Sequence, residues 1–336
     1  MTKNKILIIG PAWVGDMVMA QCLFKLLKQQ DPFVTIDVLA PGWSMPLLAR
    51  MPEVSDAMVM PMGHGEFGLL KRRCIGKNLR DKKYRQAIVL PNSFKSALIP
   101  WFAKIPKRTG WRGEMRYGLL NDLRVLDKNK YPLMIEQFMA LGLPANASLP
   151  KPYPQPELNI SDVSRDQAVL TFQLKTDRPV LALCPGAEFG PAKRWPEEHY
   201  AALANEKINA GWQVWLFGSA KDQSVTEKIM ALTDQRCVNL AGKTKLEEAI
   251  DLLSLARAVV SNDSGLMHIA AALQKPLIAV YGPTSSAFTP PLDEQAKIVS
   301  LSLTCQPCFQ RTCPLQHHRC MRDLQPQRVL DAMSEF

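Results

Sequence analysis

An acidic residue follows the first predicted strand of the chain, at the point where a helix begins. Residues 10–16 read Gly-Pro-Ala-Trp-Val-Gly-Asp, and the two glycines permit a tight turn above a sheet. Asp16 can cap this helix, which is worth about 1 kcal/mol. It can also act as a general base, because a helix N-terminus keeps a carboxylate ionised and able to accept a proton. The residues alone leave both interpretations open.

A second turn followed by a helix has groups suited to a phosphorylated ligand. Residues 262–273 read as a polar turn and then a helix rich in alanine. The free backbone N–H groups near Ser264 can bind phosphate, and Gly265 permits close approach of the backbone. Asp263 can cap this helix and still belong to a site. His268, about one turn in, is either a half-buried imidazole or a ligand contact.

Two more loops follow predicted strands of the second half. Residues 185–196 form a Gly- and Pro-rich loop in which Lys193 stands next to an arginine. This pair can neutralise a diphosphate or form a solvated face. The turn of residues 218–222 offers the Ser219 hydroxyl to a ribose.

The first half also has polar loops at the ends of predicted strands. Residues 91–96 follow one strand, and residues 109–117 are polar, aromatic and rich in glycine. Arginine supplies forked donors to phosphate or carboxylate, so these loops suit an anionic acceptor. The candidate acceptor-binding side chains are Trp13, Asn92, Lys95, Arg112 and Arg116.

Short aliphatic runs alternate with longer amphipathic stretches, which is typical of parallel sheets covered on both faces by helices. We expect strands at residues 5–10, 35–40, 57–60, 87–90, 180–184, 213–217, 237–240, 258–261 and 277–281. We expect helices at residues 16–29, 199–210 and 246–256. The predicted fold class is α/β, with two Rossmann-like, doubly wound domains facing a central cleft, where such folds bind ligands.

A proline-rich connector separates the two halves. Five prolines lie between residues 143 and 156 without helical periodicity, and proline stiffens an extended chain. We therefore place the first domain at residues 1–160, with the linker starting near residue 143, and the second domain at residues 161–322.

Composition restricts the function classes. The chain has 336 residues, 47% of them apolar, and a formal charge of +10, which points to an anionic partner. No apolar run reaches the roughly 18 residues of a membrane span, and the N-terminus lacks a signal-peptide core. We therefore expect a cytoplasmic protein.

Two other classes fit the residues poorly. Residues 63–68 match G-x-G-x-x-G, but they follow a third strand rather than a first, so we interpret them as a glycine-rich loop and not as a dinucleotide site. Nucleic-acid binding is disfavoured because the cations are spread over loops, without a basic helix or interleaved aromatic residues.

Four of these segments together resemble the heptosyltransferases of the inverting glycosyltransferase family 9, which have the GT-B architecture. The segments are residues 10–17, 91–96, 185–196 and 262–268, and the resemblance covers almost the whole chain. It implies an acceptor-binding first domain and an ADP-heptose-binding second domain. It also implies that a C-terminal helix, within residues 323–336, packs back on the first domain.

The resemblance assigns roles to individual positions. It implies that Asp16 is the catalytic base and that Lys193 binds the diphosphate and stabilises the leaving ADP. Thr244 falls near the adenine contact, and the ribose partner is open because Ser219 replaces a glutamate found in some relatives. The implied donor-binding set is Gly186, Lys193, Ser219, Thr244, Asp263, Ser264, Gly265 and His268.

The implied reaction moves L-glycero-D-manno-heptose from ADP-heptose to the first heptose of the lipopolysaccharide inner core. Relatives of the first or third type, which act on a different inner-core acceptor, are the alternative. The partners expected are the nucleotide sugar and a phosphorylated lipid A–Kdo–heptose acceptor, without nucleic acid. We further expect no required cofactor, a monomer, and peripheral contact with the cytoplasmic face of the inner membrane.

Four of the eight cysteines lie close together near the C-terminus. Cys305, Cys308, Cys313 and Cys320 begin with a Cys-x2-Cys half-site that is common in structural zinc sites, although the second pair is spaced unusually wide. A disulfide, or free thiols that pack a loop, are the alternatives.

Overall fold

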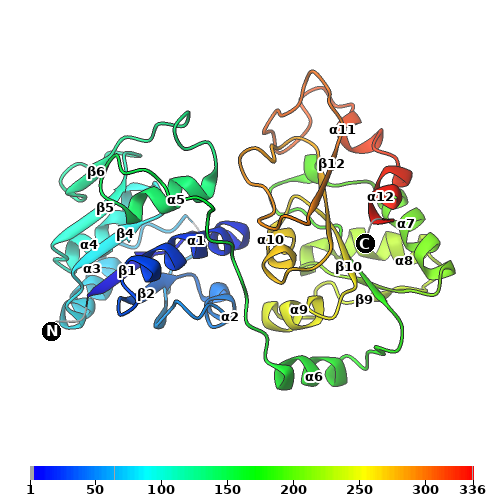
Figure 1. Cartoon of the computed structure of the whole chain (residues 1–336), viewed down its shortest axis with the longest axis horizontal. Helices are drawn as coiled ribbons and strands as arrows, with labels where there is room; N and C mark the ends of the chain where they lie inside the picture. Colours follow the sequence, from blue (N-terminus) through cyan, green and yellow to red (C-terminus); the bar gives the residue numbers. More distant parts are fainter. Residues whose placement is uncertain (1–3, 64, 335) are drawn as a thin grey trace. The chain divides into compact units, whose positions relative to one another are not determined.

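The computed structural model describes residues 4–63, 65–334 and 336, and it divides into two compact units. Unit 1 is Met1–Pro156 and unit 2 is Glu157–Phe336 (Figure 1). The division falls at the end of the proline-rich connector, slightly before the boundary expected at residue 160. Within the described residues, no helix is long and apolar enough to cross a membrane.

Unit 1 is built around a six-stranded parallel sheet with the order β3-β2-β1-β4-β5-β6. Its strands are β1 (Lys5–Ile9), β2 (Thr35–Ala40), β3 (Asp56–Val59), β4 (Gln86–Val89), β5 (Lys107–Trp111) and β6 (Asp122–Arg124). Its helices are α1 (Val14–Gln30), α2 (Met45–Leu48), α3 (Leu69–Asn78), α4 (Leu98–Phe102) and α5 (Met134–Gly142). Helix α1 packs against α5, and α3 packs against α4.

Unit 2 repeats this plan with the strand order β12-β11-β10-β7-β8-β9, again all parallel. Its strands are β7 (Val180–Cys184), β8 (Gln213–Leu216), β9 (Val238–Asn239), β10 (Ala258–Asn262), β11 (Leu277–Tyr281) and β12 (Lys297–Ser300). Its helices are α6 (Asp162–Thr171), α7 (Glu197–Asn209), α8 (Gln223–Leu232), α9 (Leu246–Leu253), α10 (Gly265–Ala272), α11 (Arg319–Arg322) and α12 (Pro326–Met333).

The C-terminal helix α12 belongs to unit 2. Val329 and Met333 are buried in the hydrophobic core of that unit, and α12 packs against α7, as the red and green helices of Figure 1 show. Helix α12 also contacts β11 and β12 of the same unit. The expected packing of this helix on the first domain stays a prediction.

The strand order of each sheet fixes where a ligand can bind. In unit 1 the order reverses between β1 and β4, and in unit 2 it reverses between β7 and β10. Loops that leave such neighbouring strands in opposite directions open a crevice at the carboxyl edge. Three of the four segments singled out in the sequence directly follow β1, β7 and β10, and residues 91–96 follow β4 after one residue.

The strands with long apolar runs lie close to where the sequence predicts them, whereas β5 and the edge strands β6 and β12 were not predicted. Each of these three strands includes at least two exposed or half-buried residues, and none has a continuous apolar run. An edge strand is covered by one neighbour only, so its sequence need not be uniformly apolar. Residues 63–68 follow β3, as expected, but His64 lies outside the described residues.

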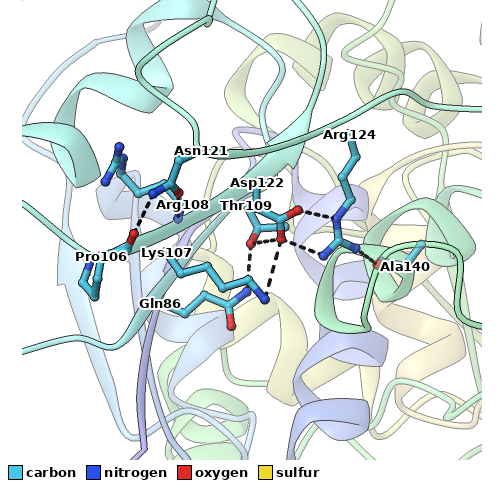
Figure 2. A network of polar contacts seen from close by, with 9 residues as sticks. All are labelled: Gln86, Pro106, Lys107, Arg108, Thr109, Asn121, Asp122, Arg124 and Ala140. Atoms are coloured by element: carbon cyan, nitrogen blue, oxygen red, sulfur yellow. Dashed lines mark hydrogen bonds and ion pairs between the residues drawn. The ribbon is translucent and has the colours of Figure 1, made fainter.

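A polar network links strand β5 of unit 1 to the edge strand β6 (Figure 2). Asp122 accepts hydrogen bonds from Thr109 Oγ1 at 2.9 Å and from Arg124 Nη2 at 2.8 Å, and Arg124 also donates to the Ala140 carbonyl at 2.6 Å. Burial raises the pKa of Asp122, but the hydrogen bonds from Arg124 and Thr109 outweigh it, so the pKa lies below its usual value. The ionised carboxylate therefore stabilises this sheet edge.

Replacing Asp122 by alanine should destabilise unit 1. Asp122→Ala leaves the buried Thr109 hydroxyl and Arg124 guanidinium without their acceptor, which should lower the free energy of unfolding by about 1–3 kcal/mol. Urea titration followed by tryptophan fluorescence measures this change. The matched control is Asp81→Ala, an exposed acid of the same unit, which should cost less than about 0.5 kcal/mol. Equal midpoints for wild type and Asp122→Ala would contradict the analysis.

Candidate functional site

Asp16 lies in the first turn of α1, directly after the loop that leaves β1. Trp13 holds the N-cap position, so the interpretation of Asp16 as the capping residue is corrected. A Cβ at Gly10 would lie 2.8 Å from Met17 Cε and 3.0 Å from Ala40 Cβ, so glycine lets the chain pass close to α1 and β2 here. Asp16 is half-buried and Trp13 is 42% exposed. The helix dipole favours the ionised form of a carboxylate at this position.

The two candidate acceptor loops of unit 1 contact each other. The Glu114 N–H donates to the Asn92 carbonyl at 3.2 Å, and the Phe94 N–H donates to the Glu114 carboxylate at 2.7 Å. Asn92 and Arg112 are exposed and Lys95 is half-buried. These three side chains therefore remain available to a ligand at the carboxyl edge of β4 and β5.

Arg116 is not available in the same way, which corrects its assignment as an acceptor contact. It is 1% exposed, and its guanidinium donates to the carbonyls of Pro91 and Trp111 and to the Asn92 side chain. Burial lowers the pKa of Arg116 to about 10, which leaves it charged at neutral pH. Arg116 thus links the loop of residues 91–96 to the loop of residues 109–117, and its hydrogen bond fixes the Asn92 side chain.

In unit 2 the central feature is a buried ion pair between Lys193 and Asp263. Lys193 Nζ donates to Asp263 Oδ2 at 2.5 Å and lies 5.0 Å from the centre of the Phe189 ring. The lysine side chain is 12% exposed and the aspartate 6%. This ion pair therefore links the loop after β7 to the loop after β10, at the point where the strand order of the sheet reverses.

Thr284 is a third member of this cluster, and the sequence analysis did not predict it as a site residue. Its hydroxyl donates to Asp263 Oδ2 at 2.6 Å. Thr284 follows β11, which pairs with β10, so the position of a hydroxyl directly after a third parallel strand was the available signal. The carboxylate of Asp263 thus receives two donors from two neighbouring loops.

Asn262 is a second structurally important residue of this site that the sequence analysis did not predict. It is fully buried at the end of β10, and its amide donates to the Pro185 carbonyl at 2.7 Å. Its Oδ1 atom accepts hydrogen bonds from the Trp195 N–H at 3.2 Å and from the Tyr200 hydroxyl at 3.0 Å. Asn262 therefore holds both ends of the loop that carries Lys193.

Helix α10 begins directly after the ion pair. Ser264 is its N-cap residue, and Ser264 and Gly265 are half-buried. The first N–H groups of a helix have no partner within it, so they can bind an anionic group beside Lys193. His268 lies behind them and is buried. Burial, helped by the charge of Lys193 and opposed by that of Asp263, lowers the pKa of His268 to about 4, so the imidazole is neutral at pH 7.

The remaining donor candidates lie at the same edge of this sheet. The Ser219 hydroxyl and N–H both donate to Asp222 Oδ2, at 2.8 and 2.9 Å, and Ser219 is exposed. Gly186 lies against the same carboxylate, because a Cβ there would come within 2.6 Å of it. Thr244 is half-buried in the turn between β9 and α9. Ser219 can still accept a hydrogen bond from a sugar hydroxyl.

The buried neutral His268 should make stability depend on pH. In the unfolded chain a histidine titrates near pH 6.5, and in the folded chain His268 titrates near 4. Between these values the unfolded chain binds a proton that the folded chain excludes. The free energy of unfolding should therefore fall by up to about 3 kcal/mol as pH decreases from 6.5 to 4.

Urea titrations of wild type and His268→Gln at pH 7.5, 6, 5 and 4.5 (roughly the window set by the two pKa values) isolate this component. The difference between the two proteins should change with pH, because the variant lacks the excluded proton. Parallel curves for the two proteins across this range would show that His268 does not contribute.

The chain is similar to known proteins along nearly its whole length. Residues 72–319 match the family described as "Glycosyltransferase family 9 (heptosyltransferase)". The chain is 52% identical to lipopolysaccharide heptosyltransferase 2 of Salmonella typhimurium, over 98% of this chain and 97% of that protein. It is 51% identical to the Escherichia coli K12 protein of the same name, over the same shares.

Solved structures agree with the fold class predicted from the sequence. The structure of E. coli ADP-heptose lps heptosyltransferase II matches with a TM-score of 0.89 and 50% identity, over 98% of each chain. A glycosyl transferase family 9 structure from Veillonella parvula matches with a TM-score of 0.87 at 17% identity, which shows the fold alone. The two Rossmann-like units are therefore those of the GT-B architecture, and the chain belongs to glycosyltransferase family 9, the heptosyltransferases.

Proposed function

We propose that this enzyme transfers L-glycero-D-manno-heptose from ADP-heptose to the first heptose of the lipopolysaccharide inner core. The observation that supports this most strongly is the identity of about half of all residues, over nearly the full chain, to proteins named heptosyltransferase 2. The alternative is a first- or third-type transferase that acts on a different inner-core acceptor.

Unit 2 is the proposed donor domain. The diphosphate of ADP-heptose would bind at Lys193 and at the first N–H groups of α10, beginning at Ser264. Asp263 balances the lysine charge before the donor arrives, because a buried cation without a partner is costly. Thr244 is proposed near the adenine, and Ser219 and Gly186 near the ribose edge.

Asp16 of unit 1 is the proposed general base. It would take the proton from the 3-hydroxyl of the acceptor heptose while the oxygen of that hydroxyl forms a bond to the anomeric carbon of the donor. The bond from that carbon to the ADP oxygen breaks at the same time, and its electron pair leaves with ADP. One displacement inverts the anomeric centre, so no covalent nucleophile is needed.

Charge develops on ADP as the bond breaks, and groups that bind this charge lower the barrier. In this proposal, Lys193 and the α10 N-terminus supply that stabilisation. The proposal therefore assigns the positive charge to protein groups and requires no cofactor. Exposed Trp13, Asn92 and Arg112 and half-buried Lys95 are the proposed acceptor contacts of unit 1.

We also propose a monomeric, cytoplasmic enzyme that docks on the anionic face of the inner membrane, where its lipid acceptor resides. One face of α3 supports this idea. Leu70, Arg73 and Lys77 are exposed at helical spacing, and Phe67, just before the helix, is 50% exposed. Apolar side chains beside cations suit an anionic bilayer surface.

The acceptor assignment can be tested by following ADP release. The enzyme is incubated with ADP-heptose and with lipid A–Kdo cores that carry zero, one or two heptoses. The core with one heptose should support release, and the other two should not. Release with the core that has no heptose would favour the alternative acceptor and overturn the proposal.

The role of Asp16 predicts a loss of turnover with donor binding retained. Asp16→Asn removes the proton acceptor and should lower kcat by about 10²–10⁴-fold. Calorimetry should show unchanged ADP affinity, because the proposed ADP contacts are in unit 2. Asp81→Asn, an exposed acid of unit 1, is the control and should keep normal turnover. Wild-type turnover in Asp16→Asn would remove this residue from the role.

Membrane docking predicts selective binding to anionic vesicles. Wild type should co-sediment with phosphatidylglycerol vesicles and not with phosphatidylcholine vesicles. Arg73→Glu combined with Lys77→Glu should abolish this, since each cation near the surface contributes about 1 kcal/mol. Lys175→Glu combined with Arg178→Glu makes the same charge change at exposed sites of unit 2 and should still bind. Equal binding by both double variants would refute the assigned face.

A further inference from the structure

The four C-terminal cysteines, which the proposed reaction does not use, line one small cavity of unit 2. Cys305, Cys308, Cys313 and Cys320 surround a space of about 20 Å³, with His317 and His318 at its edge. A space of this size holds a single small ion or one water molecule. All four side chains are free thiols. Residues separated by up to fifteen positions therefore converge on one point of the fold.

The cysteine cavity is partly shielded from solvent. Cys320 is buried, and Cys305, Cys308 and Cys313 are half-buried. Ala192, Pro283 and Leu315 complete the lining. An ion held by the four sulfurs would therefore lie within the protein and not on its surface.

We propose that Cys305, Cys308, Cys313 and Cys320 together hold one thiophilic divalent metal ion, Zn²⁺ or Fe²⁺, in tetrahedral coordination. Four cysteine ligands with a Cys-x2-Cys half-site are the donor set that such ions prefer. In residues 4–63, 65–334 and 336, no group of three or more His, Cys, Asp or Glu side chains is placed so that it could already hold a metal ion. Binding therefore requires the thiols to turn into the cavity about their χ1 bonds.

The loop of residues 301–318, which contains Cys305, Cys308 and Cys313, also contacts the loop that carries Lys193. The Ala192 N–H donates to the Arg311 carbonyl at 3.1 Å, and a Cβ on Gly190 would lie 2.4 Å from the same oxygen. The Arg311 guanidinium lies 5.5 Å from the centre of the Phe189 ring, which Lys193 also contacts. Residues 301–318 contain no helix or strand, so a metal ion would fix this support.

The connection to the ion pair extends to β11. The Phe309 N–H donates to the Pro283 carbonyl at 2.7 Å, and Thr284, the next residue, donates to Asp263. The metal site would thus hold the loop that carries Lys193 and the loop whose Thr284 donates to Asp263. This second part of the inference rests on the proposed role of Lys193 in donor binding.

Metal content tests the site independently of activity. The full-length protein is purified without chelators under reducing conditions and analysed by mass spectrometry for zinc and iron. Wild type should hold about one ion per chain, and so should Cys74→Ser, an exposed cysteine of unit 1. Cys305→Ser combined with Cys308→Ser should hold less than about a tenth of an equivalent. Either metal supports the site.

A second measurement covers the case in which the double variant does not fold. Wild type stripped with a chelator is titrated with Co²⁺, and the absorption should show thiolate charge transfer and the bands of a tetrahedral ion. Absence of metal from purified wild type, together with no such spectrum, would overturn the site. A disulfide among these cysteines, found by alkylation and mass spectrometry without reductant, would overturn it as well.

The effect on the donor loop is measured by ADP affinity. Loss of the ion should weaken ADP binding by about 10-fold or more, as loss of a supporting shell does at other sites, and return of Zn²⁺ should restore it. Unchanged ADP affinity in metal-free protein would refute the supporting role. Failure of wild type to bind ADP at all would instead count against the proposed function, because metal content does not depend on it.

Discussion

The ion pair between Lys193 and Asp263 is the interaction on which the second unit depends. Both side chains are almost fully buried, and two buried charges are stable only when each has close partners. Asp263 gains a second donor from Thr284, so three loops after three parallel strands meet at one carboxylate. The sheet supplies these loops, because β7, β10 and β11 end at the same edge and lie next to one another.

The same logic explains why the two units place different chemistry at equivalent positions. In unit 1 the loop after β1 presents a half-buried carboxylate in the first turn of a helix, and the loop after β4 presents amide and amine groups. In unit 2 the equivalent positions carry a buried ion pair and an open helix N-terminus. With the roles proposed above, one fold would offer a proton acceptor in one sheet and an anion site in the other, without any change of topology.

Much of this could be predicted from the sequence, because strands with long apolar runs and the Gly-rich turns after them are local signals. Edge strands such as β6 were missed, since short strands with few buried residues leave little trace. Arg116 was placed in the wrong role because composition cannot distinguish an exposed arginine from one that is buried by long-range hydrogen bonds. Thr284 and Asn262 were missed for the related reason that their partners lie 21 and up to 77 positions away.

For the proposed diphosphate site, the buried pair sets a condition on how the anion would bind. Lys193 is already neutralised by Asp263, so an arriving anion meets a site with no net charge from these two residues. It must either share the lysine with the carboxylate or displace the carboxylate toward Thr284. Sharing leaves two anionic groups on one ammonium, and the N–H groups of α10 must then carry part of the charge. The lysine, the aspartate and the helix start therefore act together. Burial of either charged side chain without the other is unfavourable, and the helix N–H groups offset the negative charge that the lysine alone would not neutralise.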